Sequence, residues 1–405
     1  MLNSEGLYLH IPFCARKCSY CDFLSHSASK DIQHNYSTAL AELIEKLNVA
    51  PQKTLYIGGG TPNIEWPHLV HLLAALNNRG IHNNSLEEVT VELNPEFCCD
   101  EMFVKLKELG VNRLSIGCQS FVEKELTALG RIHGSDKARR ALIRAHSYGF
   151  SVSADIMLGI PYQTLQSALY SIKQAVDTGI SHISLYPLQI EEATPLARQS
   201  DLLEAIPDED EVAHMLSAAE DLLRAYGIVR YESANYAAPG FEAKHNLAYW
   251  DHKSYLGLGP SAASYLRIDE YQSLRENFQF LPALPDQSFS VRLKMTSSAQ
   301  EMIQNHYHFH LEALTEAQDA AEFFMLQARK AQGIKEEDVK EAEQILPSLS
   351  SELIRLVDDG LLKRIRNKDR KVYFAPTQKG WLLGNELFMR LWDLAPSQNT
   401  YTCTC

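Results

Sequence analysis

The chain has 405 residues, 45% of them hydrophobic, and a formal net charge of −13. This length predicts about two or three domains, one of which is allowed to be a barrel of roughly 200 to 250 residues. The acidic balance argues against broad binding to nucleic acid, and no segment approaches the roughly 18 apolar residues of a membrane span. Eight cysteines are too few for a disulfide scaffold in so long a chain, and the N-terminus lacks the pattern of a secretory signal. We therefore expect a cytoplasmic protein.

The first predicted strand, at residues 7–11, leads into a loop that carries three cysteines. Cys14, Cys18 and Cys21 are separated by three and two residues. Zinc sites usually combine one close pair of ligands with a second, distant pair, whereas three thiolates suit a 4Fe-4S cluster in which one iron keeps an open position. Reduced structural cysteines are the alternative, but free cysteines are usually buried singly and rarely cluster on a polar loop.

Strand-like and helix-like segments alternate after this loop. Five more strands are predicted, at residues 54–57, 88–93, 113–116, 152–157 and 183–188. Apolar residues recur at helical spacing between them, as at 36–47 and 165–176. A last helix, at 208–226, begins with acidic residues, as the helix dipole favours. The alternation predicts an α/β fold in which six strand–helix units form a partial (β/α)6 barrel.

Polar residues fall at the carboxyl ends of these strands, where parallel α/β folds place their ligands. Three glycines, at 58–60, close the second strand, and Glu92 lies near the end of the third. Gln119 follows the fourth strand, and Asp155 lies near the exit of the fifth. Because the cysteine loop leaves the first strand, we expect all five groups to share one active-site face.

Five motifs follow one another along the chain. They are Tyr8, HIPFC at 10–14, the C-x3-C-x2-C loop, GGGTP at 58–62 and GCQSF at 117–121. Together they resemble the radical S-adenosylmethionine superfamily, and within it the branch of the oxygen-independent coproporphyrinogen oxidases (HemN) and the HemW-type haem chaperones. The cysteine triplet alone indicates only the superfamily, whereas the later motifs narrow it to this branch. The resemblance implies a radical SAM barrel followed by a C-terminal winged-helix-like α+β domain.

The resemblance also implies two cofactors and the residues that contact them. Cys14, Cys18 and Cys21 would hold the 4Fe-4S cluster, whose open iron would chelate S-adenosylmethionine. The residues that match the family's contacts to this cofactor are Tyr8, Tyr20, Gly59, Gly60, Thr61, Glu92, Gln119, Arg131 and Asp155. The missing side chains of the two glycines would let backbone groups approach the methionyl end.

Four of these residues have side chains whose chemistry fits the cofactor. Glu92 would accept a charge-assisted hydrogen bond from the amino group, and Arg131 would pair with the carboxylate. Gln119 and Asp155 carry acceptors for the ribose hydroxyls. Taken singly, each is equally consistent with a polar residue that is satisfied elsewhere, but their order and placement favour the site.

Three features favour the chaperone side of the branch. Coproporphyrinogen oxidases carry a further cysteine two positions after the third, where this chain has Phe23, and a long N-terminal segment, whereas thirteen residues precede Cys14 here. The segment at 245–250, HNLAYW, resembles the HNxxYW haem motif of the chaperones. His245 would then be a haem ligand, with Tyr249 and Trp250 packed on the macrocycle. A histidine beside aromatic residues is as often a hydrogen-bonded core residue, and both interpretations stay open.

Four segments are predicted along the chain. They are a radical SAM partial barrel at 1–235, an extension with the HNxxYW motif at 236–310, a HemN-type winged-helix-like domain at 311–395 and a disordered tail at 396–405.

Three functions compete. We favour a haem chaperone that binds haem, a 4Fe-4S cluster and S-adenosylmethionine and transfers haem to an acceptor protein. The alternative is an oxygen-independent coproporphyrinogen III oxidase, which carries out a radical oxidative decarboxylation in porphyrin biosynthesis. A radical enzyme that acts on nucleic acid through the basic residues at 363–371 is the weakest, since such a hairpin on an acidic protein is usually solvated. No catalytic residue is assigned, and enzymatic activity, a homodimer and peripheral contact with a membrane stay open.

Overall fold

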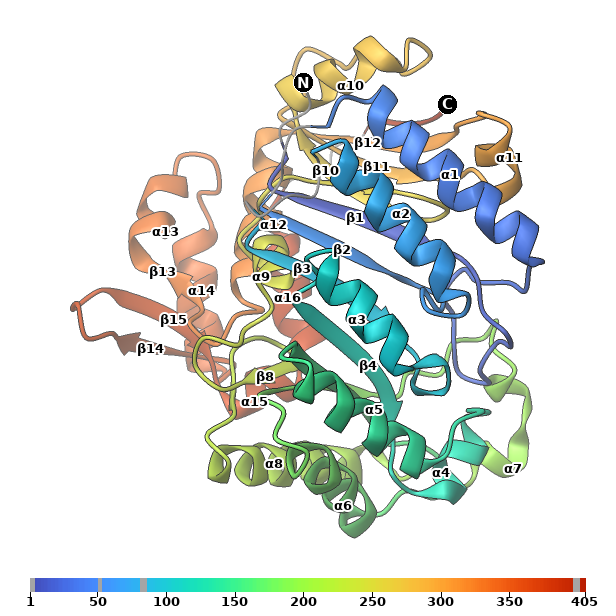
Figure 1. The fold of residues 1–405 in the computed structure, drawn as a ribbon. Coiled ribbons are helices and arrows are strands. Elements are labelled where there is room, and N and C mark those ends of the chain that lie inside the picture. The colour runs from blue at the N-terminus through green and yellow to red at the C-terminus, as the bar shows by residue number, and fades with distance from the viewer. Residues whose placement is uncertain (1–3, 50–52, 81–85, 396–400) are drawn as a thin grey trace.

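One large sheet organises the computed structural model, which describes residues 4–49, 53–80, 86–395 and 401–405 (Figure 1). In these residues the sheet has thirteen strands, which from one edge to the other are β16 (Tyr401–Thr404), β12 (Phe309–Leu314), β11 (Ser290–Met295), β10 (Ala263–Arg267), β9 (Tyr255–Leu258), β1 (Gly6–Ile11), β2 (Thr54–Gly59), β3 (Glu88–Leu93), β4 (Arg113–Gln119), β5 (Ser151–Leu158), β6 (His182–Pro187), β8 (Asn235–Ala237) and β7 (Val229–Arg230). Strands β1 to β6 are neighbours in chain order and pair in parallel. The predicted barrel of six parallel strands is confirmed.

Helices cover the outer face of these six strands (Figure 1). They are α1 (Lys30–Lys46), α2 (Trp66–Asn78), α3 (Asp100–Glu108), α5 (Ser135–Ser147), α6 (Leu165–Val176) and α8 (Glu209–Ala225). Two shorter helices, α4 (Glu123–Ala128) and α7 (Ser200–Leu203), and 3-10 turns at Pro95–Phe97 and Leu196–Arg198 lie in the connections between these elements. Asp208 caps α8 by accepting from the Glu211 backbone N–H at 2.8 Å. Among the described residues, none of the helices combines the length and the apolar character needed to cross a membrane.

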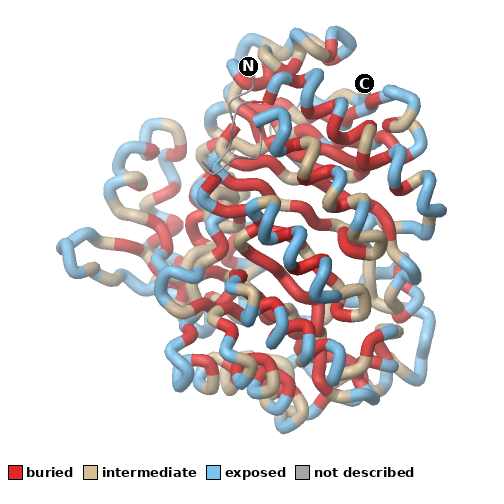
Figure 2. The backbone as a smooth tube through the Cα atoms, viewed as in Figure 1, coloured by how far each residue is buried: buried red, intermediate tan, exposed pale blue. Residues whose placement is uncertain are grey.

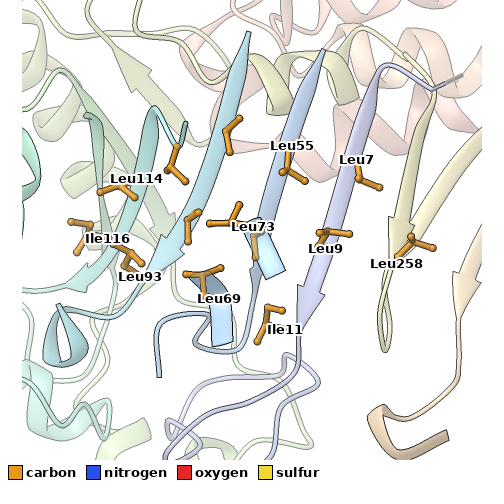
Figure 3. Close-up of a cluster of buried hydrophobic side chains, with 14 of the residues drawn as sticks. Leu7, Leu9, Ile11, Leu55, Leu69, Leu73, Leu93, Leu114, Ile116 and Leu258 are labelled. Atoms are coloured by element: carbon orange, nitrogen blue, oxygen red, sulfur yellow. The ribbon is translucent and has the colours of Figure 1, made fainter. Parts of the chain in front are cut away.

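The alternation of side chains along β1 separates the core from the site. Leu7, Leu9 and Ile11 are 1%, 0% and 7% exposed and pack with leucines of the neighbouring strands and of α2 (Figure 3). Because successive side chains of a strand point to opposite faces, Tyr8 and His10 face the inner side of the barrel. The inner face is therefore free for polar chemistry.

The C-terminal residues form a second, smaller unit with its own hydrophobic core. Its sheet has the order β13 (Ile334–Lys335), β15 (Val372–Pro376) and β14 (Leu362–Arg366). Its helices are α12 (Glu316–Gln327), α13 (Glu336–Ala342), α14 (Leu349–Asp358), α15 (Gln378–Leu382) and α16 (Gly384–Trp392). The β14–β15 hairpin projects to one side of the molecule, and the residues at 368–371 in its turn are exposed (Figures 1 and 2). This confirms the predicted winged-helix-like α+β domain.

The predicted extension contributes strands to the same large sheet. β9 pairs in parallel with β1, and β10 to β12 continue the sheet in antiparallel register. Three helices accompany them: α9 (Lys244–Trp250), α10 (Ile268–Asn277) and α11 (Ala299–Ile303). The predicted boundary at residue 311 falls within β12, a strand of this sheet, so the division into segments stays a prediction.

The predicted disordered tail is wrong for its last residues. Strand β16 pairs antiparallel with β12, and Cys403 lies opposite Leu311. The physical reason is that β12 would otherwise be an edge strand with unpaired backbone groups, which a short polar segment satisfies as well as an apolar one. The rest of that prediction, at 396–400, lies outside the described residues.

Candidate functional site

The cysteine loop is closed at its base and fastened at its tip. At the base, the His26 N–H donates to the Pro12 carbonyl at 3.0 Å, and the Cys14 N–H donates to the His26 carbonyl at 3.1 Å. At the tip, the Ser19 N–H donates to the Leu129 carbonyl at 3.1 Å, which ties the loop to the segment after α4. The loop is thus held at the carboxyl ends of the barrel strands.

Cys14, Cys18 and Cys21 are free, half-buried thiols on this loop. The Cys14 Sγ lies 3.4 Å from the Thr61 hydroxyl, and the Arg131 Nη1 lies 3.5 Å from the Cys18 Sγ. In the described part of the chain, no three His, Cys, Asp or Glu side chains converge where one metal ion would sit. A cubane cluster does not need side chains that converge on one ion, because each cysteine binds a separate iron atom. Three thiolates beside a guanidinium fit such a cluster, since a nearby positive charge favours the deprotonated thiol.

The glycines at 58–60 let other parts of the site approach β2. A Cβ on the first would lie 2.7 Å from the Glu92 carboxyl carbon, and one on the second 2.6 Å from the His10 ring. A Cβ on the third would lie 2.6 Å from the Phe13 carbonyl oxygen. The places that side chains at these positions would occupy are therefore taken by protein atoms, and the expected approach of their backbone groups to the methionyl end stays a prediction. The immediate role of these glycines is to seat Glu92 and the cysteine loop.

We expect a Gly60→Ala substitution to destabilise the fold by about 1 to 3 kcal/mol, because the added methyl group must displace the backbone of the cysteine loop. The measurement is urea denaturation together with iron content after anaerobic reconstitution. Gly80→Ala is the matched control: nothing lies within 4 Å of its Cβ, but its φ of +71° makes alanine costly by about 1 to 2 kcal/mol. Only the Gly60 substitution should reduce iron uptake, and equal uptake in both would contradict this role.

Glu92 is a partly accessible carboxylate deep on the inner face. It accepts hydrogen bonds from the Tyr56 hydroxyl at 2.7 Å and from the Gly59 N–H at 2.9 Å. Burial raises the pKa of Glu92 to about 7, against the lowering effect of these two bonds, and the negative charge of Asp155 adds to the rise. No Lys, Arg or His of the described residues forms an ion pair with Glu92. Its environment therefore favours an incoming cation such as an amino group.

Two further predicted residues lie on the neighbouring strands. Asp155 accepts from the Ser115 hydroxyl of β4 at 2.9 Å, and burial raises the pKa of its carboxyl. Gln119 has a φ of 65° at the point where the register between β4 and β5 shifts. A non-glycine residue in this region is strained, and such strain concentrates at functional sites.

Arg131 joins the cysteine loop to the ends of β3 and β4. Its Nη2 donates to the Asn94 side-chain oxygen at 3.0 Å and to the Gly117 carbonyl at 2.8 Å. Its Nε is buried without a hydrogen-bond partner among the described residues. One donor is thus left for a ligand such as a carboxylate.

Tyr8 lies on the inner face of the barrel beside Tyr56, and Tyr20 lies on the cysteine loop. The Tyr8 hydroxyl lies 2.9 Å from the His10 Nδ1, and burial raises the pKa of Tyr8. Tyr20 lies beside Arg131, and burial raises its pKa as well. The predicted cluster ligands and S-adenosylmethionine residues are therefore gathered at one end of the barrel.

The sequence analysis missed Asn94, which lies at the centre of this network. Besides its bond to Arg131, it donates to the Thr61 hydroxyl at 3.0 Å. Asn63 fixes it from both sides, by donating to its carbonyl at 3.0 Å and accepting from its N–H at 2.9 Å. Its position directly after the third predicted strand is the signal that identifies it.

His245 is the predicted site residue that lies apart from the others. It is on α9, is 1% exposed, and contacts Gly6 and Thr54, the first residues of β1 and β2, so it lies at the amino ends of the parallel strands. Its Nδ1 lies 2.8 Å from the Thr54 hydroxyl and its Nε2 2.7 Å from the Tyr249 hydroxyl, while its ring stacks on Tyr56 at 5.1 Å. Burial lowers its pKa to about 3. The structure thus has His245 as a hydrogen-bonded core residue, and its role as a haem ligand stays a prediction that requires α9 to move.

A His245→Ala substitution should cost about 3 kcal/mol of stability, because it opens a cavity and leaves two buried hydroxyls unpaired. Urea denaturation of the cofactor-free protein measures this, and His245→Gln should recover part of the loss. The histidine at position 310, which is exposed on β12, is the matched control, since its change to alanine should cost little. Equal effects of the alanine changes at the two histidines would contradict the core role.

Comparison with known proteins independently supports the family resemblance seen in the sequence motifs. Residues 8–175 match the sequence profile of the Radical SAM superfamily. A protein named "Heme chaperone HemW" from Escherichia coli (strain K12) is 37% identical over 277 residues, which cover 67% of this chain and 72% of that protein. The protein of the same name from Bacillus subtilis (strain 168) is 33% identical over 397 residues, which cover 95% of this chain and 98% of that protein.

A solved structure shares the fold over nearly the whole chain. It is the coproporphyrinogen III oxidase HemN from Escherichia coli, described as a radical SAM enzyme. The match has a TM-score of 0.75 and covers 98% of this chain and 91% of that one, at 18% identity. At this identity the similarity concerns the fold alone.

Proposed function

The chain belongs to the HemW family of the radical S-adenosylmethionine superfamily, and from that premise we propose that it is a haem chaperone. It binds haem and passes it to an acceptor protein. The observation that carries the proposal is the similarity to relatives named haem chaperones, which extends over 98% of the length of one of them. We place this activity in the cytoplasm, where thiols stay reduced.

We propose that the carboxyl ends of the barrel strands hold the two other cofactors, the 4Fe-4S cluster and S-adenosylmethionine. Cys14, Cys18 and Cys21 bind the 4Fe-4S cluster, which when bound supplies one-electron chemistry and an open iron. The residues that bind S-adenosylmethionine are Tyr8, Tyr20, Gly59, Gly60, Thr61, Glu92, Gln119, Arg131 and Asp155. Two features support this assignment: Glu92 accepts two hydrogen bonds but has no ion-pair partner among the described residues, and the Arg131 Nε has no hydrogen-bond partner there. They offer one acceptor and one donor to a zwitterionic group.

The alternative function is that of a coproporphyrinogen III oxidase. The fold is compatible with it, as the similarity to HemN illustrates. The coproporphyrinogen oxidases of this branch, however, carry a further cysteine two positions after the third. This chain has Phe23 there, and its side chain is 66% exposed.

Anaerobic reconstitution followed by two parallel assays tests the proposal. We expect the protein to retain added haem through gel filtration and to release it to an apo-haem protein used as an artificial acceptor. In the second assay, coproporphyrinogen III with S-adenosylmethionine and a reductant should be left unchanged. Formation of protoporphyrinogen would indicate the oxidase. Failure to retain haem would contradict the chaperone function and favour another radical enzyme.

A further inference from the structure

The end of α12 is fastened to the end of α9, the helix that carries the HNxxYW motif (Figure 1). The Gln327 Nε2 donates to the Trp250 carbonyl at 3.0 Å, and the Lys330 Nζ pairs with the Asp251 carboxylate at 2.5 Å. Arg329 lies between these two contacts in the chain. A residue of the C-terminal unit is therefore held beside the last residue of the motif.

Two aromatic rings hold the Arg329 guanidinium. Its Cζ lies 5.3 Å from the centre of the Trp250 ring and 4.1 Å from the centre of the Phe388 ring on α16. The attraction between a cation and a ring face is electrostatic and supplies no hydrogen-bond acceptor of ordinary strength. The rings thus position Arg329 and leave its N–H donors without such acceptors.

The Arg329 side chain has no ion-pair partner among the described residues. Its Nε is buried without a hydrogen-bond partner there, and its Nη2 contacts the Met325 sulfur, a weak acceptor, at 3.8 Å. Burial lowers the pKa of Arg329, and the negative charge of Glu232 acts in the opposite direction. The half-buried guanidinium is thus partly desolvated and incompletely paired, and an incoming anion would relieve this state.

The carboxylates around this end of α9 have other partners. Asp251 is paired with Lys330, and the Glu322 carboxylate of α12 pairs with the Arg292 guanidinium at 2.7 Å. Glu232 is 0% exposed and accepts hydrogen bonds from two groups of its own turn. A ligand is therefore the simplest source of a carboxylate for Arg329.

The cargo of the proposed function offers such a carboxylate. Haem carries two propionates on a flat apolar macrocycle, and a guanidinium matches a carboxylate with two parallel N–H donors. Trp250, the aromatic residue of the motif that lies beside Arg329, is half-buried. His245 and Trp250 are five positions apart on α9, which is about 7.5 Å along the helix axis and comparable to the distance from a haem iron to its propionates. The helix keeps this spacing if it moves.

We propose that Arg329 binds a propionate of haem at the HNxxYW motif, so that the C-terminal unit contributes an anion-binding residue to the cargo site. The inference rests on the proposed function, because it takes haem as the cargo. It gives the C-terminal unit a direct part in haem binding, through a residue that lies outside the motif.

The test is an absorbance titration of the full-length protein with ferric haem. We expect Arg329→Gln to weaken haem binding by about 10-fold, since a charge-assisted hydrogen bond is lost from a half-buried position. Arg329→Lys, which keeps the charge without the two parallel donors, should recover part of the affinity. The matched control is Arg230→Gln, because Arg230 also lies against two rings, Tyr236 at 4.6 Å and Trp381 at 5.0 Å, but is already paired with Glu220. This control should bind haem like the parent.

Haem dimethyl ester, which keeps the macrocycle but lacks the carboxylates, separates charge pairing from packing. The parent and Arg329→Gln should bind the ester alike. If Arg329 only clamped Trp250, its loss would weaken the binding of haem and of the ester equally. Equal losses, or an unchanged haem affinity in Arg329→Gln, would overturn the inference and leave the chaperone function standing. Failure of the parent to take up haem would overturn the proposed function and the inference with it.

Discussion

Replacement of Cys14, Cys18 and Cys21 by serine is expected to remove the iron–sulfur cluster from the reconstituted protein. Iron and sulfide should fall from about four of each per chain to near zero, and the brown absorbance should disappear. The reason is that serine offers no thiolate, and these three thiols share one loop whose base and tip are fixed by backbone hydrogen bonds. The barrel should still fold, because the three thiols lie outside its hydrophobic core.

A single conservative change elsewhere controls for the chemistry of the substitution. Cys99→Ser alters an exposed cysteine away from the loop and should leave the iron content unchanged. Single serine changes at each loop cysteine should lower the iron content and make the remaining cluster more sensitive to oxygen. Full iron content in the triple variant would place the cluster elsewhere or show that there is none.

A Glu92→Gln substitution is expected to have opposite effects on ligand binding and on stability. Loss of one charge-assisted hydrogen bond of about 1.5 to 3 kcal/mol should weaken S-adenosylmethionine binding by about 10- to 150-fold. The cofactor-free variant should be more stable than the parent at pH 8, because glutamine keeps a hydrogen bond to Gly59 without a buried charge. Equilibrium dialysis and urea denaturation measure the two effects.

The contribution of Glu92 to the free energy of unfolding should depend on pH. The folded-state pKa of Glu92 is raised from 4.5 to about 7, so its contribution to stability is fully present below about pH 4.5 and is lost as the pH rises through 7. The parent should lose at most about 3 kcal/mol relative to the glutamine variant between these limits. Glu87, an exposed residue directly before β3, is the control. Its pairing with Lys244 lowers its pKa, so the Glu87→Gln variant should gain no stability over the parent as the pH rises. A parent-to-variant difference that does not change with pH would mean that Glu92 is not held in a desolvated state.

Local sequence patterns determined the barrel and the identity of its cluster loop. The six parallel strands were predicted from apolar runs that end in glycine or polar residues, and α8 begins directly after Asp208, as its acidic start indicated. These features depend on the chemistry of neighbouring residues, so they can be read without knowledge of the fold. The three cluster cysteines likewise lie within one short loop, so their spacing can be read directly from the sequence.

Contacts between distant residues were decided by the tertiary structure. Arg131 meets Cys18 across 113 positions of the chain, and His245 meets Thr54 across 191. No local pattern specifies such pairs, because they follow from the order and register of the strands. For the same reason, the sequence suggested a haem ligand at His245, whereas burial and two hydrogen bonds make that side chain part of the barrel core.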